Sequence, residues 1–277
     1  MLFKIISDSA SDLFLSEGAA VYRSVPLKIV TDEKEYVDVP YMDVETMVAE
    51  LQKYKGRSGS SCPNAEDWMR EFEGADAAFC ITITGGLSGS SNAARIALEE
   101  YRRDHPEFQG YVVDTLSTGP ENALIIERLQ ALIGEGLPFA EIVERIEAYR
   151  QSTHLIFCLE SLKNLANNGR VNGTVAKVAG LLGIRIVGKA SSKGTLEITD
   201  KVRGAEKAIQ TIFKNMLRSG YNGGRVRIHH CLNLGAAERL AALLRERFEN
   251  AEILIAKTAG LCSFYAEAGG LLVGFEE

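Results

Sequence analysis

Hydroxyl side chains are concentrated in four short stretches rich in Ser, Thr and Gly, at residues 7–12, 58–64, 85–91 and 115–119. Several strands are expected to end in these loops, with helices following them. In parallel α/β sheets such loops gather at the carboxyl ends of the strands, where ligands bind. Hydroxyl groups and helix N-terminal N–H groups can together hold an anion. The alternative is that these residues only form caps and turns, which is the commoner role for any single loop.

Nucleophilic and acidic side chains in the same stretches allow an enzymatic alternative. Ser88 or Cys62 could act as the nucleophile of a hydrolase or phosphotransferase, with Asp8 or Asp114 as the base. Cys62 is expected at a helix N-terminus, where thiols can become reactive. However, no histidine is close to Cys62 in the sequence, so a packing or lining role is favoured for it. No GxSxG motif supports a serine nucleophile. Asp8 and Asp12 could form an acid–base pair or bind a metal, but helix capping is the favoured role.

Several classes of function find no support in the sequence. There is no GxxxxGK[ST] loop and no GxGxxG after a strand, so no nucleotide cofactor is expected. His229 and His230 are adjacent on an expected strand and should face opposite sides, so no metal site is expected there. The net charge of −6 argues against nucleic acid as a partner, because phosphate binding needs a basic surface.

The first half of the chain alternates strands with helices. Strands are predicted at residues 3–7, 77–84 and 110–114, with a short β-like segment at 24–38. Helices are predicted at residues 44–53, 65–72, 91–103, 121–133 and 139–149. This alternation indicates an α/β domain with a mostly parallel sheet flanked by helices.

The pattern changes from about residue 154. Helices are predicted at residues 160–168, 175–182, 205–218 and 236–248, a hairpin at 184–189 and 195–201, and strands at 225–231, 252–257 and 270–276. These elements predict an α+β domain. We therefore expect two domains, at residues 1–153 and 154–277.

Cysteine usage and the chain ends bear on location. The five cysteines are far apart and form no CxxC pair, which favours reduced thiols in a cytoplasm. The first residues lack the features of a signal peptide. The sequence contains no run of about 18 apolar residues, so no membrane span is predicted. A cytoplasmic protein is expected, and transient contact with a membrane surface is compatible with these features.

Seven short motifs follow one another along nearly the whole chain. They are ISDSASDL at 6–13, SSCP at 60–63, LSGS at 87–90, DTLSTG at 114–119, LESL at 159–162 leading to NGRV at 168–171, GLLGIRIV at 180–187 and KVR at 201–203. In this order they resemble the motifs of the DegV family, whose members include the fatty-acid-binding subunits of bacterial fatty acid kinase. No single motif is specific, and the resemblance depends on their shared order.

The resemblance implies a cytoplasmic two-domain protein that encloses a long-chain fatty acid between its domains without catalysing a reaction itself. A separate ATP-dependent kinase subunit would phosphorylate the bound acid to an acyl phosphate. The resemblance implies these residue roles: carboxylate binding by Ser60, Ser61, Ser88 and Ser90, ligand lining by Cys62 and Leu87, and contact with the kinase by Arg170 and Arg203.

The end of the chain departs from the family pattern. The family usually closes with HTGPGALGV, whereas residues 265–273 read YAEAGGLLV, which places Tyr265 at the position of the histidine. A tyrosine hydroxyl can donate to a carboxylate but carries no positive charge. Tyr265 is therefore predicted as a further carboxylate contact.

The proposed ligand sets physical requirements. A buried tail of about 16 carbons contributes roughly 12 kcal/mol gross, at about 0.8 kcal/mol per methylene, and association and ordering offset part of this. Tight binding therefore requires a preformed apolar tunnel, and the buried carboxylate must be hydrogen-bonded. Two alternatives remain open: a stand-alone lipid carrier or sensor, and the hydrolase or phosphotransferase using Ser88 or Cys62.

Overall fold

The computed structural model describes residues 1–172 and 183–277, and their strands form three sheets. The strands are β1 (Phe3–Asp8), β2 (Val21–Val25), β3 (Lys28–Thr31), β4 (Glu35–Val37), β5 (Ser58–Ser61), β6 (Ala77–Thr82), β7 (Gln109–Asp114), β8 (Thr153–Leu159), β9 (Ile184–Ala190), β10 (Leu196–Arg203), β11 (Val226–His230), β12 (Ile253–Lys257) and β13 (Leu271–Glu276). The helices are η1 (Ser9–Ser11, a 3-10 turn), α1 (Val44–Lys53), α2 (Ala65–Phe72), α3 (Ser90–Asp104), α4 (Pro120–Gly134), α5 (Phe139–Arg150), α6 (Lys163–Asn167), α8 (Ala205–Arg218), α9 (Leu234–Arg247) and α10 (Gly260–Ala266).

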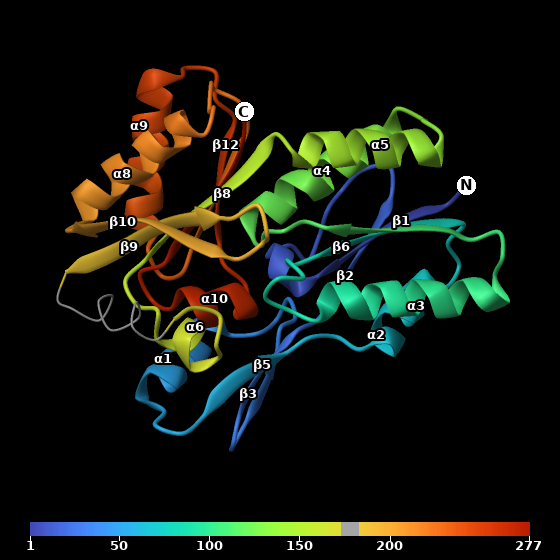
Figure 1. Cartoon of the computed structure of the whole chain (residues 1–277), viewed down its shortest axis with the longest axis horizontal. Coiled ribbons are helices and arrows are strands. Elements are labelled where there is room, and N and C mark those ends of the chain that lie inside the picture. The colour runs from blue at the N-terminus through green and yellow to red at the C-terminus, as the bar shows by residue number, and fades with distance from the viewer. Residues whose placement is uncertain (173–182) are drawn as a thin grey trace.

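The N-terminal sheet has the order β2-β1-β6-β7, and every neighbouring pair in it is parallel. Its buried strands alternate between two cores. Phe79 and Ile81 pack with α4 and α5, whereas Cys80 packs on the opposite face with α2 and α3. Figure 1 shows the two helix pairs on either side of this sheet. The predicted parallel sheet flanked by helices is confirmed.

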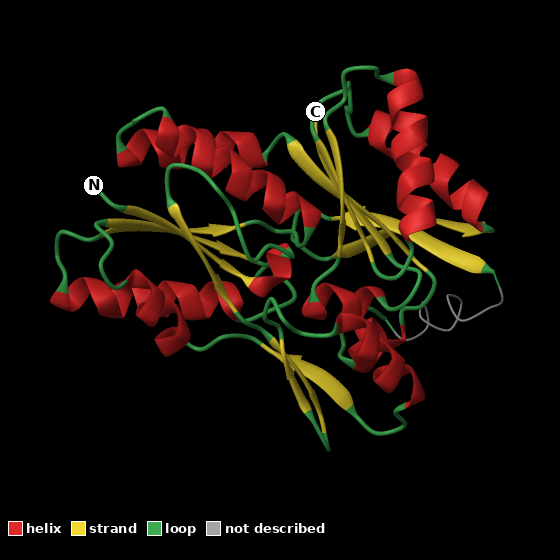
Figure 2. Ribbon diagram, turned by 180° about the vertical axis from the view of Figure 1, so that it is seen from behind, coloured by secondary structure: helices red, strands yellow, loops and turns green. Residues whose placement is uncertain are grey.

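The mixed sheet has the order β10-β9-β8-β13-β11-β12 and is antiparallel except for the β11–β12 pair. The predicted hairpin is formed by β9 and β10. Helices α8 and α9 cover one face of the sheet, as Figure 2 shows. The other face carries Leu155, Phe157 and Leu159, which point toward the N-terminal half of the chain. This is the predicted α+β part of the fold.

Helix α4 lies between the two large sheets. Ile125, Ile126 and Leu129 are fully buried against the N-terminal sheet, and the helix also contacts β13, β11 and β8. A helix that is apolar nearly all round is expected in such a position. The start of α4 approaches β13 so closely that a Cβ on Gly274 would lie 2.5 Å from the backbone nitrogen of Glu121.

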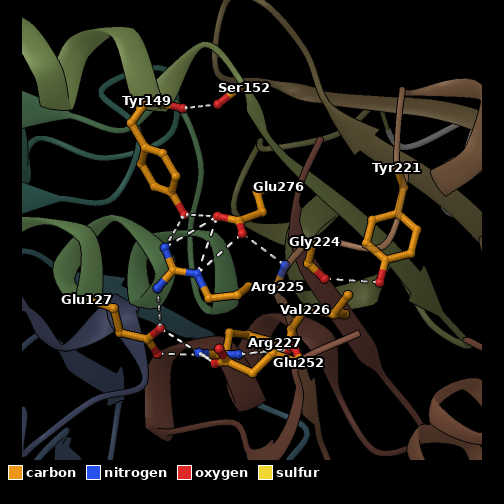
Figure 3. A network of polar contacts seen from close by, with 10 residues as sticks. All are labelled: Glu127, Tyr149, Ser152, Tyr221, Gly224, Arg225, Val226, Arg227, Glu252 and Glu276. Carbon is orange, nitrogen blue, oxygen red and sulfur yellow. Dashed lines mark hydrogen bonds and ion pairs between the residues drawn. The ribbon is translucent and has the colours of Figure 1, made fainter. Parts of the chain in front are cut away.

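A polar network joins the same helix layer to the mixed sheet (Figure 3). Glu127 on α4 accepts hydrogen bonds from Arg227 Nε at 2.8 Å and from Arg227 Nη2 at 2.6 Å. Arg225 forms an ion pair with Glu276 at 3.3 Å, and Tyr149 donates to Glu276 at 2.7 Å. The Arg227 side chain is almost inaccessible to solvent, so its pairing holds the two halves in one relative position.

The small sheet has the order β4-β3-β5 and is antiparallel. Ile29 on β3 and Met47 on α1 share a core with Leu155 and Phe264 of the C-terminal half. A division at residues 1–153 and 154–277 therefore separates the two large sheets, while the small sheet packs against the C-terminal side. We keep this boundary as a proposal.

Several segments differ from the sequence-based expectation, and strand β8 is among them because no strand was predicted at residues 153–159. Residues 58–61 were predicted as loop and form β5, because their backbone pairs with β3. The helix expected at 160–168 is only α6, and Ser161 Oγ accepts a hydrogen bond from the N–H of Lys163 at its start. Helix α10 was not predicted. The helix expected at 175–182 lies outside the described residues. In the part of the chain that is described, no helix is long and apolar enough to cross a membrane.

Candidate functional site

A cavity of about 300 Å³ lies between the N-terminal and C-terminal halves of the chain. Its wall is mainly aliphatic. The apolar side chains that line it are Leu27, Ile83, Leu87, Leu155, Phe157, Leu159, Leu165, Leu196, Leu261, Ala266 and Leu272. This volume falls at the lower end of the range for ligand pockets, about 300–1,000 Å³.

One strand provides much of the cavity floor. Leu155, Phe157 and Leu159 alternate along β8 and therefore project from the same face of the mixed sheet. Leu272 on β13 is the direct cross-strand neighbour of Phe157 and extends the floor onto the adjacent strand. The floor thus runs along β8 for about four residues, or roughly 13 Å at about 3.3 Å per residue.

Hydroxyl groups from three separate segments meet in the wall. Ser60 and Ser61 lie on β5, Ser88 on the loop after β6, and Tyr265 on α10, and all four line the cavity. The Ser60 Oγ and Tyr265 Oη atoms are 2.8 Å apart. Ser88 Oγ accepts from the N–H of Ser90 at 3.3 Å. Among the described residues the Ser88 hydroxyl donates to no acceptor, so its proton is available to a bound anion.

Cys62 and Leu87 also line the cavity, next to these hydroxyl groups. The Cys62 sulfur lies 3.3 Å from the position that a Cβ on Gly89 would occupy, so the β5 segment and the loop after β6 are in contact there. The structure thus brings together six of the predicted head-group and lining residues.

Arg170 adds a positive charge that the predicted ring of hydroxyls did not contain. Its Nε donates to the carbonyl of Leu87 at 3.2 Å, its Nη1 donates to the carbonyl of Asn168, and its side chain lines the cavity. It forms no ion pair with a carboxylate in the described part of the chain. Arg170 was predicted as a partner contact, and the structure places its side chain in the cavity wall.

Ser90 lies beneath the cavity and is absent from its wall. It is fully buried and donates to Asp8 Oδ2 at 2.6 Å, and the N–H of Ile83 donates to the same oxygen at 2.9 Å. Asp8 therefore holds the loop after β6 in place. We accordingly leave Ser90 out of the head-group set proposed below.

Burial raises the pKa of the Asp8 carboxyl from 3.8 to about 7. The folded chain therefore holds this proton more tightly than the unfolded chain does. The contribution of Asp8 to the free energy of unfolding should therefore be fully present below pH 3.8, fall as the pH rises to about 7, and change little above that. Each pKa unit corresponds to about 1.4 kcal/mol.

Replacing Asp8 with asparagine should flatten this dependence, because the amide can still accept from Ile83 and Ser90 but does not titrate. Urea unfolding at several pH values between 4 and 8 would measure it. Asp38, whose pKa burial raises to about 6, should leave a residual dependence over the narrower range up to about pH 6. An Asp8→Asn variant with the slope of the parent would contradict the assignment.

Carboxylates of the N-terminal half also fix α10, which carries Tyr265. Asp38 accepts from the N–H of Gly260 at 2.7 Å and of Leu261 at 2.9 Å. Asp12 Oδ1 accepts from the N–H of Ala259 at 2.7 Å, and its Oδ2 lies 2.8 Å from His229 Nδ1. Anionic groups at a helix N-terminus are stabilising. The helix capping favoured for Asp8 and Asp12 is not observed, because η1 has no side-chain cap. The Asp12 carboxylate instead accepts from the N–H of Ala259, the residue that precedes α10.

The side chains proposed for the enzymatic alternative are not assembled. Asp114 accepts from the N–H of Gly85 at 3.0 Å, and Asp8 is occupied by Ser90 and Ile83. Within the described residues neither carboxylate is hydrogen-bonded to Ser88 or Cys62. The same residues contain no group of three or more His, Cys, Asp or Glu side chains that could hold a metal ion.

Arg203 is the last residue of β10. It is exposed and does not line the cavity.

Sequence reasoning missed several wall residues from the C-terminal half, above all Phe157, Leu261 and Leu272. The continuous apolar run at residues 155–159 was the available signal for Phe157, but a run that is apolar on both faces could not show which face of the strand met a cavity.

Two large sheets with an apolar cavity between them, and hydroxyl groups in its wall, define a class of ligand-binding α/β protein. The family model described as "Uncharacterised protein, DegV family" matches residues 2–277. The chain belongs to the DegV family, as the resemblance predicted.

Solved structures support the assignment. The chain is 43% identical to the Fatty Acid Kinase (Fak) B3 protein of Streptococcus pneumoniae, whose crystal structure is loaded with linoleic acid. That match covers 100% of this chain and 99% of the other, with a TM-score of 0.98. A DegV family protein from Eubacterium eligens, loaded with heptadecanoic acid, is 40% identical over 99% of both chains, with a TM-score of 0.96. A DegV domain-containing protein of Streptococcus pyogenes is 41% identical over 279 residues, covering 100% of both chains.

Proposed function

We propose that the chain binds one long-chain fatty acid in the cavity between its halves. The observation that carries this proposal is the long aliphatic wall combined with free hydroxyl and guanidinium donors in the same cavity. The aliphatic wall removes the tail from water, which is the main source of affinity. The relatives loaded with linoleic and heptadecanoic acid support the same ligand class.

The carboxylate is proposed to bind Ser60, Ser61, Ser88 and Tyr265, with Arg170 supplying charge. A carboxylate in an apolar cavity must be fully hydrogen-bonded, because an unpaired buried charge is very unfavourable. Hydrogen bonds from a cation to a carboxylate are among the stronger ones. Tyr265 contributes the donor that the family's histidine would supply, and its bond to Ser60 aligns both hydroxyls.

The chain is further proposed to act as a binding subunit that presents the carboxylate to a separate ATP-dependent kinase, in a cytoplasm. The relative that is named a fatty acid kinase B3 protein supports this role. Ser61 and Cys62 are exposed at the edge of the cavity, so an incoming phosphoryl group could reach the carboxylate from that side. Arg203, exposed on β10, is proposed as a contact for the kinase subunit.

Mass spectrometry of the natively purified protein tests the ligand. We expect a co-purified long-chain fatty acid in about one copy per chain. Protein that is empty and also fails to bind added fatty acid would refute the proposal. Incubation of the loaded protein with ATP, with and without the kinase subunit of the same cell, tests presentation. Acyl phosphate is expected only with the kinase, and lipid binding without any product would leave the stand-alone carrier.

The Ser88→Ala variant tests the head-group site. We expect fatty acid binding to weaken by about 1–3 kcal/mol, because a hydrogen bond to a charged group is lost. Isothermal titration with a fatty acid and with the matching alcohol measures the effect. The alcohol has no carboxylate, so its affinity should change less. Equal losses for the two ligands would place the carboxylate elsewhere.

A further inference from the structure

Gly188 on β9 lies directly under the ring of a residue of the cavity floor. It is the cross-strand neighbour of Phe157 on β8, so both residues face the same side of the sheet. A Cβ built on Gly188 would lie 2.3 Å from Cζ and 2.7 Å from Cε2 of Phe157. Gly188 does not have a positive φ angle. A glycine is therefore required here by the space that the ring and the carbonyl oxygen of Glu197 occupy, and not by the backbone conformation.

The Phe157 ring occupies the middle of the floor. Leu155 and Leu159 flank it at the two neighbouring positions on the same face of β8, and Leu272 lies opposite on β13. Leu159 lies on the side that leads to α6 and Arg170, so Leu155 lies toward the far end. These three leucines surround the Phe157 ring on the remaining sides. A side chain larger than glycine at position 188 would therefore push the ring into the cavity.

We propose that Gly188 sets the width of the cavity at its midpoint, and thereby the shape of the acyl chains that it accepts, by letting the Phe157 ring lie flat on the sheet. This inference rests on the proposed function, because it assumes that an acyl chain occupies the cavity. Gly188 acts through Phe157 and has no contact with the ligand itself. It is a specificity-determining residue that is absent from the cavity wall.

The proposal predicts which ligands are affected. A cis double bond near the middle of a chain bends it and requires more width there than a straight saturated chain does. A wide midpoint accepts both shapes, whereas a narrow midpoint favours straight chains. The residue type at position 188 therefore controls discrimination between saturated and cis-unsaturated acids of equal length.

The Gly188→Ala variant tests this with stearic and oleic acids, which differ only by one cis double bond. Isothermal titration should show the affinity for oleic acid falling about tenfold or more relative to that for stearic acid, which is typical of a small misfit in an apolar pocket. Gly235→Ala on α9 is the matched control, because a Cβ there meets open space. Equal losses for both acids, or no loss, would overturn the proposal.

The same Cβ would also lie 2.5 Å from the carbonyl oxygen of Glu197 on β10, so Gly188→Ala can disturb the hairpin. The Phe157→Leu variant provides a second test, because it removes the ring. It should shift preference toward oleic acid, and the Gly188→Ala/Phe157→Leu double variant should match Phe157→Leu in its preference. An unchanged preference in Phe157→Leu would overturn the proposal even if Gly188→Ala does not fold.

Fatty acid binding and the role of Gly188 can be refuted separately. If the parent protein binds neither acid, the proposed function fails and this inference falls with it. If the parent binds both acids and the variants change neither preference, only the role of Gly188 is refuted.

Discussion

Leu155→Trp should weaken fatty acid binding by about a hundredfold or more. The indole would project from β8 into the far part of the cavity and exclude the end of the acyl tail. At about 0.8 kcal/mol per methylene, loss of four buried carbons removes about 3 kcal/mol, which corresponds to roughly a hundredfold in affinity. Displacement of a fluorescent fatty acid by unlabelled palmitic acid would measure the change.

A matched substitution separates a blocked cavity from a general effect of tryptophan. Leu254 on β12 is 50% exposed and does not line the cavity. Leu254→Trp should therefore bind as the parent does. Thermal unfolding should show that both variants fold. Parent-like affinity in a folded Leu155→Trp variant would mean that the tail lies elsewhere.

Asp12→Ala should produce the largest loss of stability among single substitutions near the site. It removes the acceptor of the Ala259 N–H and the partner of His229, and both groups are buried. Buried polar groups that lose their partners cost about 1–3 kcal/mol each. Because two such groups lose their partner, we expect the free energy of unfolding in urea to fall by roughly 3 kcal/mol or more.

Asp43 offers the comparison for this variant, because its carboxylate also accepts a backbone N–H at the start of a helix but is exposed. It accepts from the N–H of Thr46 at the start of α1. Asp43→Ala should cost about 1 kcal/mol, as is typical for an N-cap. If Asp12→Ala costs no more than Asp43→Ala, the Asp12 contacts with α10 do not hold the two halves together.

Much of the fold could be predicted from local signals. Asp43 is the predicted N-cap of α1 and caps it in the structure, and α8 spans the predicted residues 205–218. The buried strands β6 and β13 follow from continuous apolar runs bounded by glycine. In each case the residues that determine the element lie within it or next to it in the chain.

Strand β5 and helix α10 escaped prediction because distant residues stabilise them. β5 has the sequence SGSS, without an apolar residue, and exists because its backbone pairs with β3. Helix α10 starts with a glycine and has only seven residues, too few for independent stability. Its N-terminus depends on Asp12 and Asp38, more than 200 positions earlier in the chain.

The same reasoning applies to the cavity. Ser60 and Ser88 belong to loops that composition alone marks as candidates, and both line it. Ser90 is just as polar and lies only two residues from Ser88, but the start of α3 turns it toward Asp8. The position of Arg170 depends on the path of the chain after α6, which no local pattern describes.

The dependence of α10 on early residues constrains how the polypeptide can be made. During synthesis Asp12 and Asp38 leave the ribosome long before Ala259 does. Their carboxylates therefore cannot bind the N–H groups at the start of α10 until translation is nearly complete. A separately expressed C-terminal fragment beginning at β8 would lack them altogether and should not form a stable α10. Circular permutants that keep both regions in one polypeptide remain able to close the contact.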